Sequence, residues 1–253
     1  MFTRKMLIKL PETIKTLYFV GDIHGNLELI KYYINTHHLK DSAIFICGDV
    51  GMGFQPKWER AMIDYINKKL VLNNCFVIGV RGNHDNPLCF QDISLTKLNG
   101  KPINWLNVPD YSIINVANKN VLCIGGGISV DRSWRLEKGY GYWENEQIVY
   151  QPKIEEKIDI IVTHSAPTFC YPFTKGSFVM EYAKNDENLL ADIQTERETL
   201  DKVWEDYKST LTNWYYGHYH SNNSQVIDNV MFRLLDVGEI VRHYDNDSIE
   251  DCS

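Results

Sequence analysis

Five short apolar runs, each closed by glycine, aspartate, histidine or asparagine, most strongly constrain what this chain can fold into. Near-continuous runs of this length, rich in β-forming residues and followed by turn residues, are typical of buried strands with functional loops at their carboxyl ends. With their closing residues, the runs are Leu17–Gly25 (LYFVGDIHG), Ala43–Gly51 (AIFICGDVG), Phe76–Asp85 (FVIGVRGNHD), Val121–Gly127 (VLCIGGG) and Ile158–Pro167 (IDIIVTHSAP).

Helix-like segments separate or follow these runs, at Leu27–His37, Pro56–Leu72 and Ala191–Ser209. Alternation of strands with helices predicts an α/β fold. The later stretch Gln225–Tyr244 has period-two pieces and turn residues, which predict an antiparallel meander.

The 253 residues contain no repeat, low-complexity tract or Pro/Gly linker, so we predict a single domain over residues 1–253. Residues 129–147 and 166–191 fit the strand–helix rhythm poorly. Both stretches directly follow predicted strand ends, where loops carry function in open α/β sheets. We therefore interpret them as loop insertions over a functional site.

Bulk properties narrow the class of protein. The formal net charge of −7 argues against a general nucleic-acid binder or a membrane-surface binder. The first residues lack the apolar core and cleavage site of a secretion signal, and no stretch has the roughly 18 apolar residues of a membrane span.

Cys47, Cys75 and Cys123 lie in apolar runs without a C-x-x-C pair, which predicts free thiols in a reducing compartment. We expect a cytoplasmic protein.

Polar side chains gather at the predicted strand ends. Taken singly, each has an ordinary structural explanation as a turn residue, a helix cap or a hydrogen-bonded histidine. Two of the histidines stand one residue apart after an aromatic run, so on an extended strand their rings would share a face. The set comprises five of the eight histidines, two acids and an amide: His24, His84, His164, His218, His220, Asp22, Asp49 and Asn83.

The remaining histidines, His37, His38 and His243, lie in helical or late-strand sequence without acid partners, and we interpret them as surface or structural residues.

Together, the clustered residues predict a centre for two metal ions. Imidazole with carboxylate suits Mn²⁺, Fe or Zn²⁺, and we expect Mn²⁺ first; the lack of a nearby cysteine argues against a thiolate site. Two metals about 3.5–4 Å apart can clamp the oxygens of an in-line displacement. Two carboxylates opposing two divalent ions leave a formal charge of about +2, which suits an anionic substrate such as a phosphate ester.

Five sequence motifs support this reading as a set. They are GDIHG at 21–25, GD at 48–49, GNHD at 82–85, TH at 163–164 and GHYH at 217–220. In order and in residue type they resemble the motifs of the calcineurin-like metallophosphoesterases. The resemblance implies a four-layer α/β/β/α sandwich of two mixed sheets flanked by helices, with a dinuclear site on strand-end loops.

The resemblance also implies a role for each site residue. One metal would be held by Asp22, His24 and His220, the other by Asn83, His164 and His218, and Asp49 would bridge both. A hydroxide between the metals would attack phosphorus in line. His84 would not bind metal and would instead stand beside the leaving oxygen as general acid.

One family feature is missing. The serine/threonine phosphatase branch continues its second motif as G-D-x-x-D-R-G, whereas this chain has GDVGMG at 48–53. The acid that would orient His84 and the arginine that would grip phosphate are therefore absent there. Asp85, next to His84, is our catalytic candidate for orienting His84.

For the phosphate grip, Arg132 and Arg135 are our substrate-binding candidates, because guanidinium matches phosphate oxygens. Ordinary ion pairs with Asp131 or Glu137 are the alternative. Arg81 is a weaker candidate.

Nearby aromatic residues have two readings. Tyr140, Tyr142 and Trp143 either line the pocket or belong to the core, and the core is the favoured interpretation.

The sequence thus predicts a hydrolase that cleaves a phosphomonoester or small nucleotide; a phosphoprotein substrate also fits. The alternatives are a phosphodiesterase or nuclease of the same family and a non-catalytic scaffold that keeps the fold. A scaffold should show a lost ligand or a lost His84, and every position is filled here. Purely structural metals are disfavoured, because structural zinc prefers cysteine-rich sites.

Overall fold

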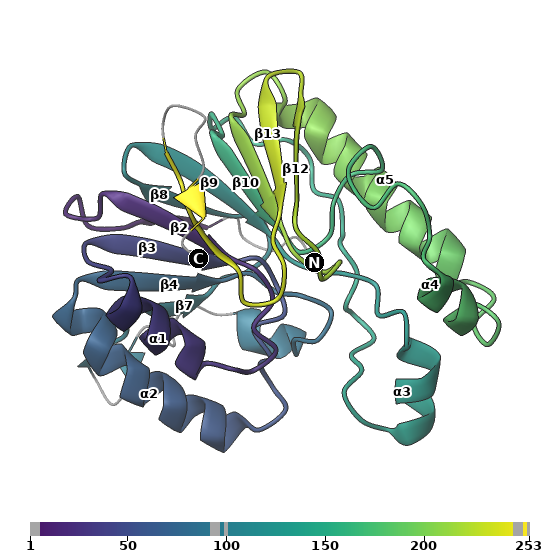
Figure 1. Ribbon diagram of the computed structural model, residues 1–253, viewed down its shortest axis with the longest axis horizontal. Coiled ribbons are helices and arrows are strands. Elements are labelled where there is room, and N and C mark those ends of the chain that lie inside the picture. The colour runs from purple at the N-terminus through teal and green to yellow at the C-terminus, as the bar shows by residue number, and fades with distance from the viewer. Residues whose placement is uncertain (1–5, 92–96, 99–100, 245–249, 252–253) are drawn as a thin grey trace.

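The apolar runs form neighbouring strands in two sheets that pack face to face (Figure 1). The computed structural model describes residues 6–91, 97–98, 101–244 and 250–251. Three of the runs enter one sheet and two enter the other, so the strand ends that carry the polar motifs meet at one place.

Within the described ranges, the first sheet has six strands. β2, β3, β4 and β7 run parallel, and β14 joins β2 in the antiparallel sense. In spatial order the strands are β15 (Glu250–Asp251), β14 (Ile240–Arg242), β2 (Thr16–Val20), β3 (Ser42–Ile46), β4 (Cys75–Gly79) and β7 (Trp105–Asn107).

The second sheet has seven strands in the part of the chain that is described. β9, β10, β11 and β13 are parallel neighbours, and antiparallel partners follow on both sides. The order is β1 (Leu7–Lys9), β8 (Ser112–Val116), β9 (Lys119–Ile124), β10 (Ile160–Thr163), β11 (Asn213–Tyr216), β13 (Val230–Leu234) and β12 (Asn223–Ile227).

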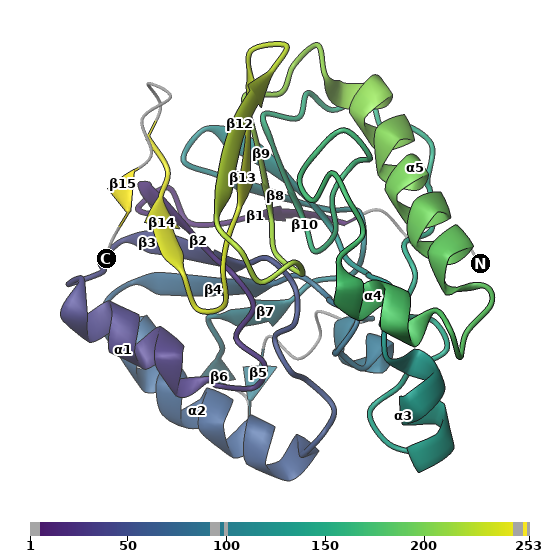
Figure 2. The ribbon, with the colours of Figure 1, turned by 45° about the vertical axis from the view of Figure 1, so that its right-hand side comes forward.

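Helices cover the outer faces of both sheets. Figures 1 and 2 show α1 (Glu28–Thr36) and α2 (Pro56–Leu72) against the first sheet and α5 (Leu189–Tyr207) against the second. The shorter elements are α3 (Arg132–Lys138), α4 (Ser177–Tyr182), the 3₁₀ turn η1 (Pro87–Phe90) and the pair β5 (Lys97–Leu98) and β6 (Lys101–Pro102).

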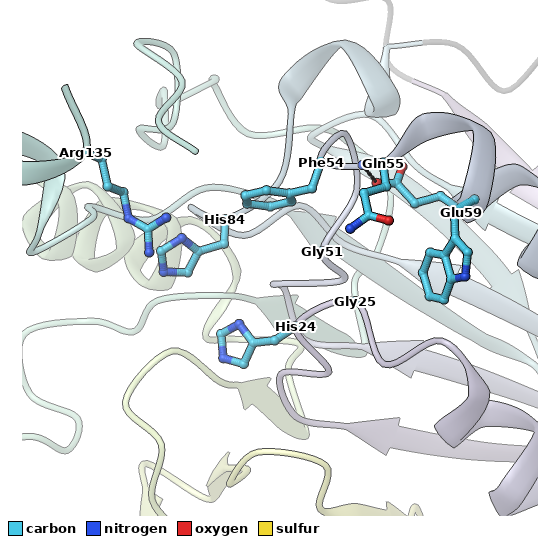
Figure 3. Close-up of a pocket in the computed structure, with 9 residues that line it drawn as sticks. His24, Gly25, Gly51, Phe54, Gln55, Glu59, His84 and Arg135 are labelled. Atoms are coloured by element: carbon cyan, nitrogen blue, oxygen red, sulfur yellow. Dashed lines mark hydrogen bonds between the residues drawn. The ribbon is translucent and has the colours of Figure 1, made fainter. Parts of the chain in front are cut away.

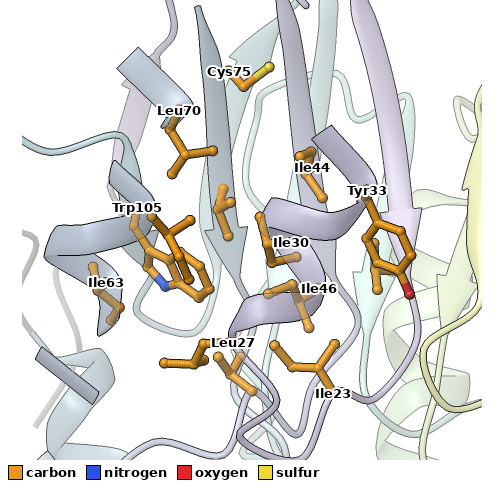
Figure 4. Packing of buried hydrophobic residues seen from close by; sticks show 14 of the residues in the cluster. Ile23, Leu27, Ile30, Tyr33, Ile44, Ile46, Ile63, Leu70, Cys75 and Trp105 are labelled. Atoms are coloured by element: carbon orange, nitrogen blue, oxygen red, sulfur yellow. The ribbon is translucent and has the colours of Figure 1, made fainter. Parts of the chain in front are cut away.

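Three apolar clusters hold these layers together. Leu27, just before α1, and Ile30 of α1 pack on Ile44 and Ile46 of β3, as Figure 4 shows. A second cluster fills the space between the two sheets, and a third lies between α5 and the second sheet. The central strands, such as β3 and β10, are therefore covered on both faces, which explains their near-continuous apolar sequence. The layer order is the predicted α/β/β/α sandwich of two mixed sheets.

The predicted elements agree with the structure except at the C-terminal end of the sequence. All five apolar runs are strands, and Pro56–Leu72 is a helix with the predicted bounds. The predicted meander over Gln225–Tyr244 is wrong in part. β12 and β13 do form a hairpin through Asp228 and Asn229, which both have positive φ, but β14 crosses to the other sheet and pairs with β2.

The two stretches interpreted as insertions contain α3 and α4, and α5 begins at Leu189, slightly before the predicted end of the second stretch. No helix in the described part of the chain combines the length and apolar character needed to cross a membrane. Among the described cysteines, Cys47, Cys75 and Cys123 are buried free thiols, as predicted, and Cys252 lies outside the described residues.

Phe19 on β2 generates a test of the inter-sheet core. Its ring is fully buried and stacks on Tyr215 of the opposite sheet, with ring centroids 3.6 Å apart, and on Phe45 of the neighbouring strand. We expect Phe19→Ala to lower the free energy of unfolding by about 3–5 kcal/mol, since it removes a large buried ring between the layers. Chemical denaturation measures this change. Leu72→Ala, at a side chain that is 77% exposed, is the matched control and should change stability by no more than about 0.5 kcal/mol.

Candidate metal centre

Loops that follow five strands bring the predicted site residues together. Asp22 and His24 follow β2, and Asp49 follows β3, its neighbour in the first sheet. Asn83 and His84 follow β4, His164 follows β10, and His218 and His220 follow β11. Because the carboxyl ends of parallel strands meet at one edge of a sheet, two sheets packed face to face bring both sets of loops to a common point.

Asp22, His24 and His220 form the first group of possible ligands, with donor atoms within 4.8 Å of one another. His220 Nε2 lies 3.2 Å and His24 Nε2 3.8 Å from Asp22 Oδ2. Asp22 Oδ2 is buried and accepts no hydrogen bond of good geometry among the described residues. A buried carboxylate oxygen left in this state is costly, and a cation between it and the two imidazoles would satisfy it.

The second group surrounds His164. Its Nε2 lies 2.9 Å from Asn83 Oδ1, 3.2 Å from His218 Nδ1 and 3.3 Å from Asp49 Oδ1. Its Nδ1 lies 2.9 Å from the carbonyl oxygen of Cys47, an acceptor only, so Nδ1 carries the proton and donates it. In the neutral ring, Nε2 therefore presents a lone pair toward other electron-rich atoms, which is the arrangement a metal ion needs.

The electrostatics of the site favour positive charge. Burial opposes protonation of His164, but the carboxylates of Asp49 and Asp22 outweigh it and raise the pKa of the ring to about 10. Burial would raise the pKa of Asp49, but His164, His84 and His24 hold it well below its usual range. The field that would hold a proton here would also hold a cation. The residues present therefore fit a divalent metal centre.

His218 and His220 reach the site by a route that the sequence analysis did not foresee. β11 ends at Tyr216, and both histidines lie in the following loop with positive φ angles of 70° and 43°. The expectation that they share one face of a strand is therefore wrong. His218 faces His164, whereas His220 faces Asp22 and His24.

Other site residues share this strained backbone, since His24 and Asp49 also have positive φ, at 44° and 45°. Left-handed backbone in residues other than glycine is uncommon and clusters at functional sites.

The glycines of the motifs have a packing cause. A Cβ atom at Gly82 would lie 2.1 Å from Asp49 Oδ1, and one at Gly217 would lie 2.1 Å from Asp22 Oδ1. Each glycine thus lets a loop backbone press directly against a carboxylate that belongs to another loop. Backbone N–H groups use this closeness, because His84 N donates to Asp49 Oδ1 and His218 N donates to Asp22 Oδ1.

His84 stands at the edge of the centre, where its ring centroid lies 5.8 Å from that of His24. Its Nδ1 is buried and has no hydrogen-bond partner among the described residues. Burial lowers the pKa of His84, the Asp49 carboxylate acts in the opposite direction, and Arg135 lowers it further.

Asp85 does not orient His84 as expected. Its fully buried carboxylate accepts four backbone hydrogen bonds, from Val50, Gly51, Met52 and Gly82. Both oxygens are occupied by these amides, so Asp85 joins the loop after β3 to the loop after β4. Its place in the site is that of a structural clamp.

The three arginine candidates differ in their partners and in their distance from the candidate metal centre. Arg132 is buried, and its guanidinium pairs with Asp186 at 2.6 Å and with Asp192 at 2.7 Å. These partners differ from Asp131 and Glu137, the ones considered from the sequence. Arg81 is also buried, and it donates to Asp110 and to backbone carbonyls that include that of Glu146.

Arg135 pairs with Asp131 at 2.8 Å and, unlike Arg132, lines a cavity together with His84 and His24. Figure 3 shows its guanidinium directed toward the His84 ring. Of the two arginines, only Arg135 is placed beside the reacting region.

The aromatic residues of the first insertion lie outside the three core clusters, so the favoured core interpretation is wrong. Tyr140 and Trp143 pack edge-on against Phe54, while Tyr142 and Trp143 line a neighbouring cavity.

Two supporting residues were missed from the sequence. Asn83 Nδ2 donates to Ser129 Oγ at 3.0 Å, and Ser129 Oγ in turn donates to Glu146 Oε2 at 2.6 Å. Ser129 and Glu146 are both buried, and both belong to the stretch 129–147. The sequence signal was the position of Ser129 in the loop that follows the run Val121–Gly127.

Comparison with known proteins agrees with this geometry. A family model described as calcineurin-like phosphoesterase matches residues 15–222, a range that includes all five motifs. None of the curated proteins compared with the sequence matches it.

Solved structures add a likeness of shape. One is an archaeal phosphodiesterase, which is 12% identical in sequence; the match covers 93% of this chain and 98% of that one, with a TM-score of 0.43. Another is a phosphopantetheinyl hydrolase from Mycobacterium tuberculosis, also 12% identical; the match covers 90% of this chain and 91% of that one, with a TM-score of 0.42. A third is Vps29 from Entamoeba histolytica in complex with zinc, which is 9% identical; the match covers 92% of this chain and 88% of that one, with a TM-score of 0.39. At these TM-scores the likenesses carry no argument about activity or substrate. The family match covers most of the sequence, and it shows that this chain belongs to the calcineurin-like phosphoesterases, a family whose general activity is metal-dependent hydrolysis of phosphoesters.

Proposed function

We propose that this chain hydrolyses phosphomonoesters or small nucleotides with two divalent metal ions, Mn²⁺ being the first expectation. The observation that supports this best is the convergence of three possible metal ligands, because His164 Nε2 lies 2.9 Å from Asn83 Oδ1 and 3.3 Å from Asp49 Oδ1. Such atoms repel one another unless a cation or a proton lies among them.

The ligands would divide as the motifs imply. Asp22, His24 and His220 would hold one ion, and Asn83, His164 and His218 the other, with Asp49 between the two groups. When bound, the ions supply Lewis acidity toward phosphoryl oxygens and lower the pKa of water. The chain supplies the rest.

His84 is our candidate for general acid. Burial keeps its pKa low, but Asp49 already acts in the opposite direction, and a phosphate dianion beside the ring would add to that effect. We infer that bound substrate raises the pKa of His84 and favours the imidazolium. The imidazolium can then give a proton to the leaving oxygen.

Arg135 is our candidate for holding phosphate. Its Nε and Nη1 donate to Asp131 and to the Gly141 carbonyl. These two contacts fix the guanidinium plane at the cavity beside His84. Arg132 lacks this placement, because Asp186 and Asp192 hold it elsewhere.

Ser129 and Glu146 would position Asn83. The amide nitrogen of Asn83 donates to Ser129, so its oxygen is the atom that faces His164. The Ser129 hydroxyl can accept this bond because it donates its own proton to Glu146. Partners of this kind behind a ligand usually fix its orientation.

A phosphodiesterase or nuclease is the second candidate. A nuclease for long nucleic acid needs a basic groove, and in the part of the chain that is described the cavity beside His84 is lined by a single arginine. A monoester or small nucleotide therefore fits better. The five described free cysteines support our placement of the protein in a reducing compartment such as the cytoplasm.

Replacing His84 and Asp49 separates chemistry from metal binding. We expect His84→Ala to lower kcat on an aryl phosphate by about 10²- to 10⁴-fold, since a general acid is lost, while metal content stays normal. Asp49→Ala should lose bound metal. Elemental analysis and steady-state kinetics with Mn²⁺ measure both effects. Normal metal content and full activity in Asp49→Ala would contradict the bridging assignment.

Arg135 and Arg132 form a matched pair for testing the phosphate grip. We expect Arg135→Gln to lower kcat/KM about 10- to 100-fold on every ester, because one charge-assisted hydrogen bond to phosphate is lost. Arg132→Gln should lower the Tm and leave KM nearly unchanged, since it breaks contacts with α5 and the preceding turn. A raised KM in Arg132→Gln at unchanged Tm would reverse the two assignments.

Ser129→Ala tests the support of Asn83. We expect the affinity for Mn²⁺ at one of the two sites to fall about 10-fold, as is typical when a ligand loses its outer partner. Calorimetric titration of metal-stripped protein measures each site separately. Ser133→Ala on the nearby helix α3 is the control, and equal affinities in the two variants would exclude a positioning role for Ser129.

A further inference from the structure

The cavity beside His84 extends well beyond the space that a phosphate group needs. Its volume is about 610 Å³, within the range typical of small-molecule sites, roughly 300–1,000 Å³. Figure 3 shows His24, His84 and Arg135 at one end and Gln55 and Glu59 at the other, with Phe54 between them. Because one end adjoins the metal centre, the remainder is available to the group attached to phosphate.

The two ends of the cavity differ in charge. His24, His84 and Arg135 provide imidazole and guanidinium groups at the metal end. At the far end lies Glu59, whose carboxylate accepts the backbone N–H groups of Gly53 at 2.9 Å and Gln55 at 2.6 Å. This carboxylate is fixed in place and repels phosphate, so a substrate enters with its phosphate toward the metal centre and an uncharged part toward Glu59.

Aromatic rings form the wall between these ends. Phe54 is held in place by Tyr140 and Trp143, whose ring centroids lie 5.7 Å and 4.9 Å from its own. Trp58, in the first turn of α2, also lines the cavity and is 44% exposed. Partly exposed aromatic rings such as these are platforms on which a flat π-system can stack.

The far end also carries polar groups that suit a heteroaromatic ring. The side-chain amide of Gln55 offers both a donor and an acceptor next to the two aromatic rings. A plain phenyl ring would use neither group and would fill little of the volume. A purine or pyrimidine would use both, and the ribose would lie between the base and His84.

We propose that Phe54, Trp58 and Gln55 form a subsite for the base of a nucleoside monophosphate, the substrate class of the phosphoesterase reaction proposed above. The ester oxygen of the ribose then lies beside His84. When the P–O bond breaks, that oxygen keeps the bonding electron pair and takes the proton from His84, while water supplies the oxygen that completes inorganic phosphate.

The test compares AMP with ribose 5-phosphate, which have the same phosphate, the same leaving oxygen and the same sugar and differ only by the base. We expect the wild type with Mn²⁺ to prefer AMP in kcat/KM by at least about 10-fold, since stacking on an aromatic side chain contributes about 1–3 kcal/mol per base. Trp58→Ala and Phe54→Ala should remove most of this preference, because kcat/KM falls more for AMP than for ribose 5-phosphate. Trp134→Ala, at an equally exposed tryptophan (51%) that does not line the cavity, is the matched control.

Binding of adenosine, the product of AMP hydrolysis, provides a measurement that does not need turnover. Calorimetry should show binding to the wild type and to Trp134→Ala, and at least 10-fold weaker binding to Trp58→Ala.

Equal kcat/KM for AMP and ribose 5-phosphate in the wild type, together with unchanged adenosine affinity in Trp58→Ala, would overturn the subsite but leave the phosphoesterase function intact. Loss of adenosine binding in Trp58→Ala without hydrolysis of either ester would support the subsite and overturn the proposed function. Selective loss of phenyl phosphate turnover in both variants, with no preference for AMP, would overturn the assignment to a nucleotide base.

Discussion

The structure depends on balancing two buried negative charges. Asp22 and Asp49 are each only 1% exposed, and a lone carboxylate in such a place would be strongly destabilising. Imidazoles and backbone N–H groups from other loops surround both acids. Loops from two sheets must therefore close on the same two side chains, and this requirement fixes how the sheets align at their carboxyl ends.

Much of the fold was predictable because burial leaves a direct mark on sequence. Strands covered on both faces become continuous apolar runs, and α2 shows a helical pattern bounded by proline. The C-terminal part was less predictable. Period-two sequence identifies β13 and β14 as strands, but it carries no information on which sheet each strand joins, because that depends on contacts with β11 and β2 far away in the chain.

For the candidate metal centre, the sequence predicted which residues lie together but not how they are arranged. The residues that would bind metal sit in short motifs, and all of them lie together as expected. Their geometry was not readable, since His218 and His220 converge through left-handed turns rather than through strand alternation. Asp85 was misread because adjacency to His84 says nothing about direction. Its carboxylate turns instead toward four amides that belong to two loops.

Residues 129–147 contact both the candidate metal centre and the wall of the cavity beside it. Ser129 and Glu146 lie behind Asn83, while Tyr140 and Trp143 brace Phe54. Arg132, for which the sequence left open a phosphate grip or an ordinary ion pair, ties this segment to Asp186 and Asp192. A segment without recognisable motifs therefore shapes both the ligand sphere and the cavity wall.

The clamp made by Asp85 is separate from the anchor of the cavity wall. Its hydrogen bonds end at Met52, whereas the aromatic wall begins at Phe54 and is anchored separately by Glu59. Two different carboxylates therefore hold the backbone that follows Asp49 and the backbone beside the cavity wall. The side chains at 54, 55 and 58 take no part in these hydrogen bonds, so we expect substitutions there to reshape the cavity wall while both anchors stay in place.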